Sequence, residues 1–107
     1  MKLITAIVNH DDSSSVLSEL TKKGFSVTKV ASTGGFLLAG NVTFFVGTQD
    51  EKVEEVLSVI KENARRRTQL VPPIGGSADG GTMSIPIEVT VGGATVFITD
   101  VERFEKF

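Results

Sequence analysis

Two amphipathic stretches, each flanked by short apolar runs rich in β-branched residues, constrain the fold of this chain more than any other feature. We expect Ser13 to cap the first helix and Gly24 to end it in a left-handed conformation. The second stretch opens at Thr48 with a predicted capping box, Thr-Gln-Asp-Glu, and carries an apolar stripe from Val53 to Ile60. Each helix therefore needs a sheet or another helix to cover its apolar face.

The apolar runs around these helices predict the strands of one sheet. They are Leu3–Val8, Phe25–Ser32, Val42–Val46, an alternating Ile85–Val91 and Ala94–Ile98. Gly40-Asn41 predicts a tight turn before the third run, and Gly92-Gly93 predicts a two-residue hairpin between the last two. The glycine- and proline-rich Val71–Ser84 segment predicts a long irregular loop. We expect the tail from Val101 to form a short helix or an arm.

The resulting β-α-β-β-α-β order predicts an α+β fold, a ferredoxin-like sandwich with both helices on one face of the sheet. The whole chain, 1–107, is expected to form a single domain. In the first strand Leu3 and Ile7 alternate with Ile4 and Val8, so that both faces of the strand are apolar. An apolar sheet face left exposed in a monomer is an interaction surface. We therefore predict a homo-oligomer in which these open faces pack together.

Composition excludes several classes of protein. The chain has no cysteine, which rules out disulfides, thiolate catalysis and zinc fingers. A net charge of −2 gives no electrostatic basis for binding nucleic acid. The N-terminal apolar run is too short and too polar for an export signal, and no segment approaches the roughly 20 apolar residues of a membrane span. We expect a cytoplasmic protein with neither nucleic acid nor a membrane as its partner.

Catalytic chemistry finds little support in the sequence, and we expect no enzyme and no metal site. His10 is the one histidine, and the adjacent Asp11-Asp12 pair is more typical of a helix start than of a metal site. Neither of the common phosphate-loop motifs occurs. The Arg65–Arg67 triplet favours a solvated helix end over a phosphate site. The glycine-rich segment Ser32–Gly47 remains as a binding feature, although residue types alone favour a core position for its Phe36.

Several blocks of sequence, in order along the whole chain, resemble one known family. The blocks are T-K-V-A-S-T-G-G-F-L, G-N-V-T-F, G-G-S-A-D, V-G-G-A-T-V-F and a C-terminal F-E-K-F. They are similar to those of the PII-like cyclic-di-AMP receptors. The resemblance implies a ferredoxin-like sandwich of the PII type, a homotrimer, and a long loop before the fourth strand, at Arg66–Ser84. It also implies a receptor without enzymatic activity, which binds one cyclic di-AMP in each cleft between neighbouring subunits and signals to a downstream protein partner.

The resemblance also implies ligand-binding positions. Phe36 would contact an adenine, with Gly35 and Leu37 lining the same pocket through their backbones, and the Asn41 amide would hydrogen-bond a base edge. The remaining positions are Val27, Thr28, Gly47, Gly92 and Phe97. Phe36 and Asn41 are the two least easily explained by packing. Gly47 and Gly92 could instead serve only as turn residues, and Phe97 could belong to the core.

Two departures from the family pattern keep an alternative open. Ser26 stands where relatives have an arginine, and Leu38 stands where a polar or charged residue is common. Both favour the alternative of a trimeric protein-interaction module whose nucleotide pocket is weakened or vestigial. A third alternative is a PII sensor of ATP or ADP with 2-oxoglutarate. Such sensors carry their long loop between the second and third strands, and that segment is short here.

Overall fold

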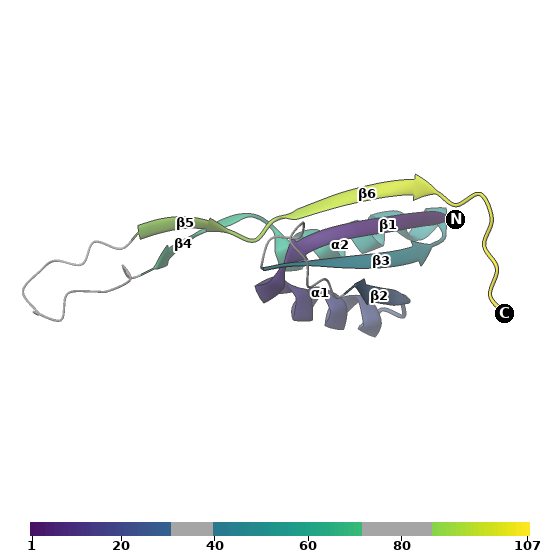
Figure 1. Ribbon diagram of the computed structural model, residues 1–107, viewed down its shortest axis with the longest axis horizontal. Coiled ribbons are helices and arrows are strands. Elements are labelled where there is room, and N and C mark those ends of the chain that lie inside the picture. Colours follow the sequence, from purple (N-terminus) through teal and green to yellow (C-terminus); the bar gives the residue numbers. More distant parts are fainter. Residues whose placement is uncertain (31–39, 72–86) are drawn as a thin grey trace, which may run out of the picture.

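Strand β1 (Lys2–Asn9) lies inside a four-stranded antiparallel sheet in the computed structural model, which describes residues 1–30, 40–71 and 87–107. The strand order is β2-β3-β1-β6, with β2 at Val27–Val30, β3 at Asn41–Thr48 and β6 at Ala94–Asp100. Both helices, α1 (His10–Lys22) and α2 (Val53–Ala64), lie on one side of the sheet (Figure 1). The α+β arrangement agrees with the predicted ferredoxin-like sandwich, and β6 takes the place of the fourth strand.

The core lies between this sheet and the two helices. Burial alternates along β1, where Ile4, Ala6 and Val8 are buried and their neighbours are not. The helices contribute their apolar stripes, and Phe44 of β3 is the largest fully buried side chain. The remaining buried members of the cluster are Val16, Leu20, Val42, Val46, Val56, Val59, Ile60 and Ala64. The predicted apolar stripes therefore do face the core.

The opposite face of the sheet, here called the outer face, is also partly apolar. The strand register places one row across it in the order Thr28, Phe45, Thr5, Phe97. Phe45 is 37% exposed and Phe97 is 56% exposed, because neither of the described helices covers this side. The sequence-based prediction of apolar side chains on both faces is thus confirmed within the protomer.

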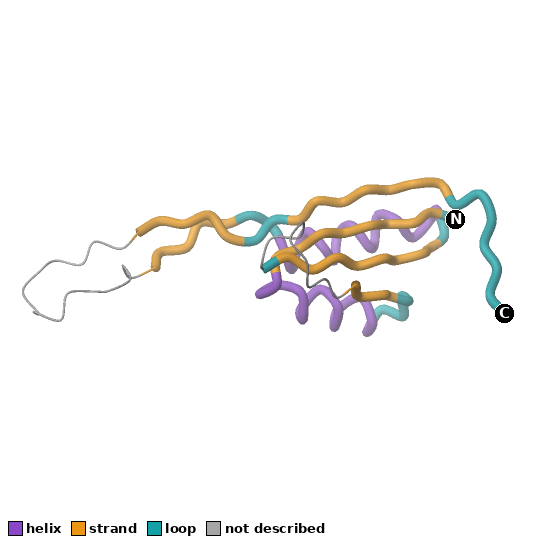
Figure 2. Tube along the Cα trace, in the orientation of Figure 1, coloured by secondary structure: helices purple, strands orange, loops and turns teal. Residues whose placement is uncertain are grey.

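A separate two-stranded ribbon projects from one end of the sheet (Figure 2). It pairs β4 (Arg67–Val71) with β5 (Ile87–Val91). The long loop that the resemblance implies at Arg66–Ser84 is therefore wrong over residues 67–71, and the irregular loop predicted from composition is wrong at Val71. The prediction that Gly92-Gly93 forms a hairpin is also wrong, because β5 pairs with β4 while β6 pairs with β1. Both glycines do have positive φ, +76° and +90°, but they carry the chain from one sheet to the other.

Both predicted helix caps lie elsewhere in the structure. Asn9 caps α1, since its side-chain oxygen accepts a hydrogen bond from the Asp11 backbone N–H at 2.9 Å. Ser13 lies within the helix and donates to the His10 carbonyl at 2.7 Å. Thr48 is the last residue of β3, and a short 3₁₀ turn, η1 (Asp50–Lys52), precedes α2 without a side-chain cap. Strand pairing extends β1 and β3 through the residues that local signals assign to loops.

The glycines, strand β2 and the C-terminal tail agree with the sequence-based predictions in part. Gly24 has φ +88° just beyond α1, as predicted. Gly40 has φ +113°, but Asn41 does not share the turn, because it begins β3 opposite Asn9. Strand β2 begins at Val27 rather than Phe25. The tail beyond β6 contains no helix and extends away from the sheet (Figure 1). Neither described helix combines the length and apolarity required to cross a membrane.

Replacing Phe44 tests this division of the sheet into two faces. Phe44→Ala removes a ring that is 0% exposed and should lower the free energy of unfolding by about 3–5 kcal/mol in urea titrations. Thr43→Ala, at the neighbouring half-buried position on the outer face, should cost less than about 1 kcal/mol. Equal losses for the two variants would contradict this assignment of the core.

Candidate functional site

A groove of about 660 Å³ lies where the end of β1, the start of β6 and the last turns of α2 meet. Apolar side chains from the sheet and the helix form part of its wall: Ile7, Leu57, Ile60, Ala64 and Val96. The backbones of Gly92 and Gly93 contribute another part. Its volume falls within the range of small-molecule sites, which are mostly apolar with a few polar groups that orient the ligand.

The polar lining of this groove is rich in cations and amides. Lys61, Arg65 and Arg66 come from the end of α2 and the residues directly after it, and all three are exposed. Asn9 and Asn41 lie opposite each other at the ends of β1 and β3. Among the described residues that line the groove, none is acidic. The groove therefore combines positive charge with amide groups that both donate and accept hydrogen bonds.

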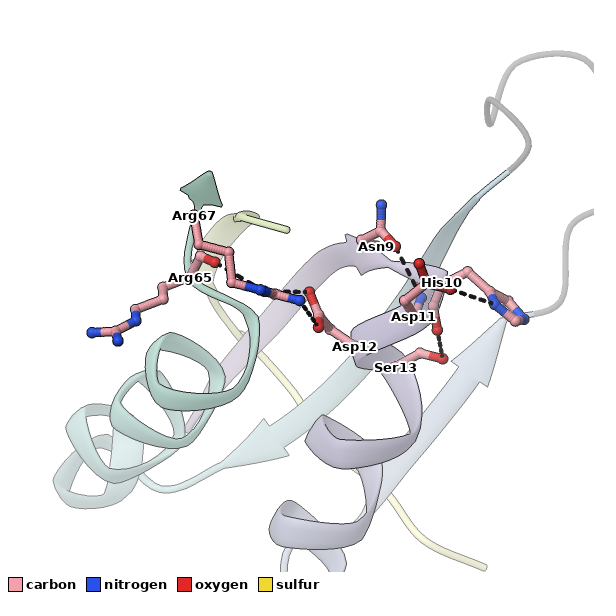
Figure 3. A network of polar contacts seen from close by, with 7 residues as sticks. All are labelled: Asn9, His10, Asp11, Asp12, Ser13, Arg65 and Arg67. Carbon is pink, nitrogen blue, oxygen red and sulfur yellow. Dashed lines mark hydrogen bonds and ion pairs between the residues drawn. The ribbon is translucent and has the colours of Figure 1, made fainter. Parts of the chain in front are cut away.

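An ion pair between Asp12 and Arg67 lies beside the groove and fixes the base of the ribbon (Figure 3). The Arg67 guanidinium donates from Nη2 to Oδ1 of Asp12 at 2.8 Å and from Nη1 to Oδ2 at 3.2 Å. Nη1 also donates to the Arg65 carbonyl at 3.2 Å. The hydrogen bonds that Arg67 donates to Asp12 raise the pKa of Arg67 further above its ordinary value, so the guanidinium stays charged. Asp12 is 7% exposed, which makes it a buried anchor on α1.

Gly92 packs directly against this ion pair. A Cβ atom added there would lie 2.5 Å from Arg67 Nη1 and 2.7 Å from the Arg65 carbonyl oxygen. Its φ of +76° also disfavours any residue with a side chain. The close contacts and the positive φ therefore both explain the glycine at this position, whether or not a ligand approaches it.

The match to known proteins covers the whole chain. A family model described as "Cyclic-di-AMP receptor" matches residues 1–107. The chain belongs to the cyclic-di-AMP receptor family. It is also similar to a crystal structure of a functionally unknown protein from Pediococcus pentosaceus ATCC 25745, at 38% sequence identity and a TM-score of 0.80. That match covers 99% of this chain and 96% of the other.

The ligand contacts predicted from the family resemblance lie in different regions of the structure. Asn41 and Gly92 both line the groove. Thr28 and Phe97 lie in the same row across the outer face, separated by Phe45 and Thr5. The family resemblance therefore selects residues from two adjoining regions, the groove and the outer face.

Other predicted contacts lie apart from these two regions. Val27 packs against the core, so its side chain lies on the face of the sheet opposite to Thr28. Gly47 lines a second hollow of about 250 Å³, near the far end of β3. Six residues of extended strand separate it from Asn41, a span of about 20 Å. Gly35, Phe36 and Leu37 lie outside the described residues.

Sequence reasoning missed the cationic lining of the groove. The sequence predicts a solvated helix end for the Arg65–Arg67 triplet, whereas Arg67 binds Asp12 and the other two arginines line the groove. Lys61 precedes Arg65 by four residues, a spacing that places the two on one helix face, and this was the available signal. Asp11 and Asp12 do lie in the first turn of α1, as predicted. Within the described residues, no group of three or more histidine, aspartate or glutamate side chains could hold a metal ion.

Removing the ion pair should loosen the ribbon selectively. In Arg67→Gln the buried Asp12 loses its charged partner, so we expect faster amide hydrogen exchange along β4 and β5 but not along β1. Asp12→Asn should have a similar effect, and the double variant should exceed neither single variant. Arg103→Gln, which breaks the exposed pair with Glu105, is the control. Unchanged ribbon exchange in Arg67→Gln would show that pairing within the ribbon alone holds it.

Proposed function

We propose that this protein is a signal-transduction receptor that binds cyclic di-AMP in the clefts between subunits of a homotrimer and catalyses no reaction. The observation that carries the proposal is the family match over residues 1–107. A receptor of this kind acts in the cytoplasm and passes the signal to a downstream protein partner. Its physical basis is differential binding, because a ligand that favours one conformation of the protein increases the population of that conformation.

The positions of the expected contacts support a site shared between subunits. Asn41 and Gly47 lie at opposite ends of one strand, about 20 Å apart. Two neighbouring subunits can more readily present these ends to one small ligand than a single subunit can. The apolar outer face supports assembly, because Phe45 and Phe97 are large, partly exposed and in one row. Gly35, Phe36 and Leu37 complete the proposed pocket, with Phe36 against an adenine.

Asn41→Ala tests both the ligand and the pocket. Wild-type protein should show saturable heat with cyclic di-AMP at about one ligand per subunit. The Asn41 amide can both donate and accept a hydrogen bond, and each such bond contributes about 1 kcal/mol. Loss of both should weaken binding about tenfold or more. Asn63→Ala is the matched control, since that amide donates to the Val59 carbonyl at 2.8 Å within α2 and does not line the groove. Binding that survives Asn41→Ala unchanged would remove Asn41 from the site, and absence of wild-type binding would refute the receptor.

Phe45→Glu tests the assembly. A charge in the middle of the outer face should convert the trimer to monomers in sedimentation velocity, with the fold retained because Phe45 lies outside the core. Leu70→Glu places the same charge at a position that is 62% exposed on the ribbon, away from the four-stranded sheet, and should leave the trimer intact. A trimer that persists in Phe45→Glu, or a wild-type monomer, would contradict the proposed interface.

A trimeric protein-interaction module remains the second candidate, and the ribbon is the feature that favours it. Leu70 and Ile87, 62% and 51% exposed, lie on its two strands, and a two-stranded ribbon alone is only marginally stable in water. A protein partner could cover these side chains. Affinity capture with and without cyclic di-AMP separates the candidates. A set of partners that does not respond to the dinucleotide would favour the interaction module over the receptor.

A further inference from the structure

We propose that Lys61, Arg65 and Arg66 hold a phosphodiester group of the bound dinucleotide within the 660 Å³ groove. This inference rests on the proposed function for the identity of the ligand, cyclic di-AMP. It adds a site for the ligand's charge, whereas the contacts expected from the family resemblance are mainly apolar, backbone or amide groups. It also assigns a role to two members of the arginine triplet.

The first argument is the local charge. The chain as a whole has a net charge of −2, yet the three charged residues that line the groove are all cations. The nearby carboxylate, Asp12, already binds Arg67 in two hydrogen bonds. It is therefore compensated by Arg67 rather than by the three cations of the groove. Guanidinium groups suit phosphate oxygens, because their N–H groups form a planar fork that donates two parallel hydrogen bonds.

The second argument is how the fold positions these cations. Lys61 lies in the last turn of α2 and Arg65 is the C-cap of that helix, and both line the groove. Arg66 passes beside Gly93, whose added Cβ would lie 3.7 Å from the Arg66 Cβ. The chain segments on either side of the ribbon are thus packed together here, and they bring Arg66 to the groove that Asn41 also lines.

The third argument is the match between the groove and the parts of a nucleotide. The cations lie together with the amides of Asn9 and Asn41, and apolar residues such as Ile7 and Leu57 line the same groove. A phosphodiester carries a negative charge, whereas the attached nucleoside offers apolar surface and a base edge with both donors and acceptors. An amide can pair with such an edge through its N–H and its oxygen. One groove thus offers partners to each part of the ligand.

Cations at a helix C-terminus also favour the helix dipole, and this alternative sets the control. Helix α1 likewise has a cation in its last turn, Lys22, and Arg103 is a second exposed cation, in the tail. Neither lines the groove or the second hollow, which Gly47 lines. The variant Lys22→Gln/Arg103→Gln therefore removes two charges, one of them from an equivalent helix end, without touching the proposed site. It matches Arg65→Gln/Arg66→Gln in charge.

The experiment is calorimetric titration of cyclic di-AMP into wild type and both double variants at several salt concentrations. Arg65→Gln/Arg66→Gln should bind about 10- to 100-fold more weakly, and its affinity should depend less on salt, because fewer charged contacts form. Lys22→Gln/Arg103→Gln should match the wild type in both respects. Thermal melts of both variants should confirm that each is folded before titration.

Each outcome decides a different question. Unchanged affinity and salt dependence in Arg65→Gln/Arg66→Gln would overturn the phosphate site and leave the receptor standing. Equal weakening in both double variants would also overturn the site, because only the net charge would then matter. If wild type does not bind cyclic di-AMP, the proposed function fails, and inorganic pyrophosphate becomes the probe. Saturable pyrophosphate binding that is lost only in Arg65→Gln/Arg66→Gln would support an anion groove, and no binding to wild type would overturn it.

Discussion

Strand β1 is hydrogen-bonded along both edges, to β3 on one side and to β6 on the other, and the rest of the structure depends on this double pairing. It fixes the register of three strands at once. A slip of one residue in either ladder would turn buried side chains such as Ile4 and Val8 toward solvent. Because alternate residues of β1 are also apolar, the same register that builds the core creates the partly apolar outer face. The exposure of Phe45 and Phe97 on that face is therefore a consequence of the fold's central strand.

The parts of the fold that could be predicted from sequence are those in which burial leaves a periodic pattern. The stripes of α1 and α2, the alternation in β1 and the position of Gly24 all follow from local residue order. The Arg67–Val71 strand could not be predicted in this way, because its described side chains are exposed and its ladder is with β5 alone. The Gly92-Gly93 segment shows the same limit. Two glycines between apolar strands permit a hairpin, and only the pairing of β6 with the distant β1 excludes it.

The residues of the candidate site were only partly predictable from sequence. The family resemblance predicts Asn41 and Gly92, which have little in common as residue types and lie far apart in the sequence. The structure places them in one groove and adds the cations of the arginine triplet. Sequence alone could not divide that triplet, because Arg67 is distinguished from Arg65 and Arg66 only by Asp12, which lies 55 positions earlier in the chain. The three adjacent arginines thus differ in position: Arg67 pairs with Asp12, whereas Arg65 and Arg66 line the groove.

The groove and the ribbon share the residues at which the chain leaves the body of the protein. Arg65 and Arg66 line the groove, and Arg67 begins β4 while it holds Asp12. On the returning segment, Gly92 lines the groove and packs against the same ion pair. A ligand held by Arg65 and Arg66 is therefore within two residues of the contact that orients the ribbon. Linkage is reciprocal, so any ligand that favours one orientation of the ribbon binds more tightly when a partner holds the ribbon in that orientation. In the proposed receptor, this short connection would be the physical route from the ligand to a partner protein.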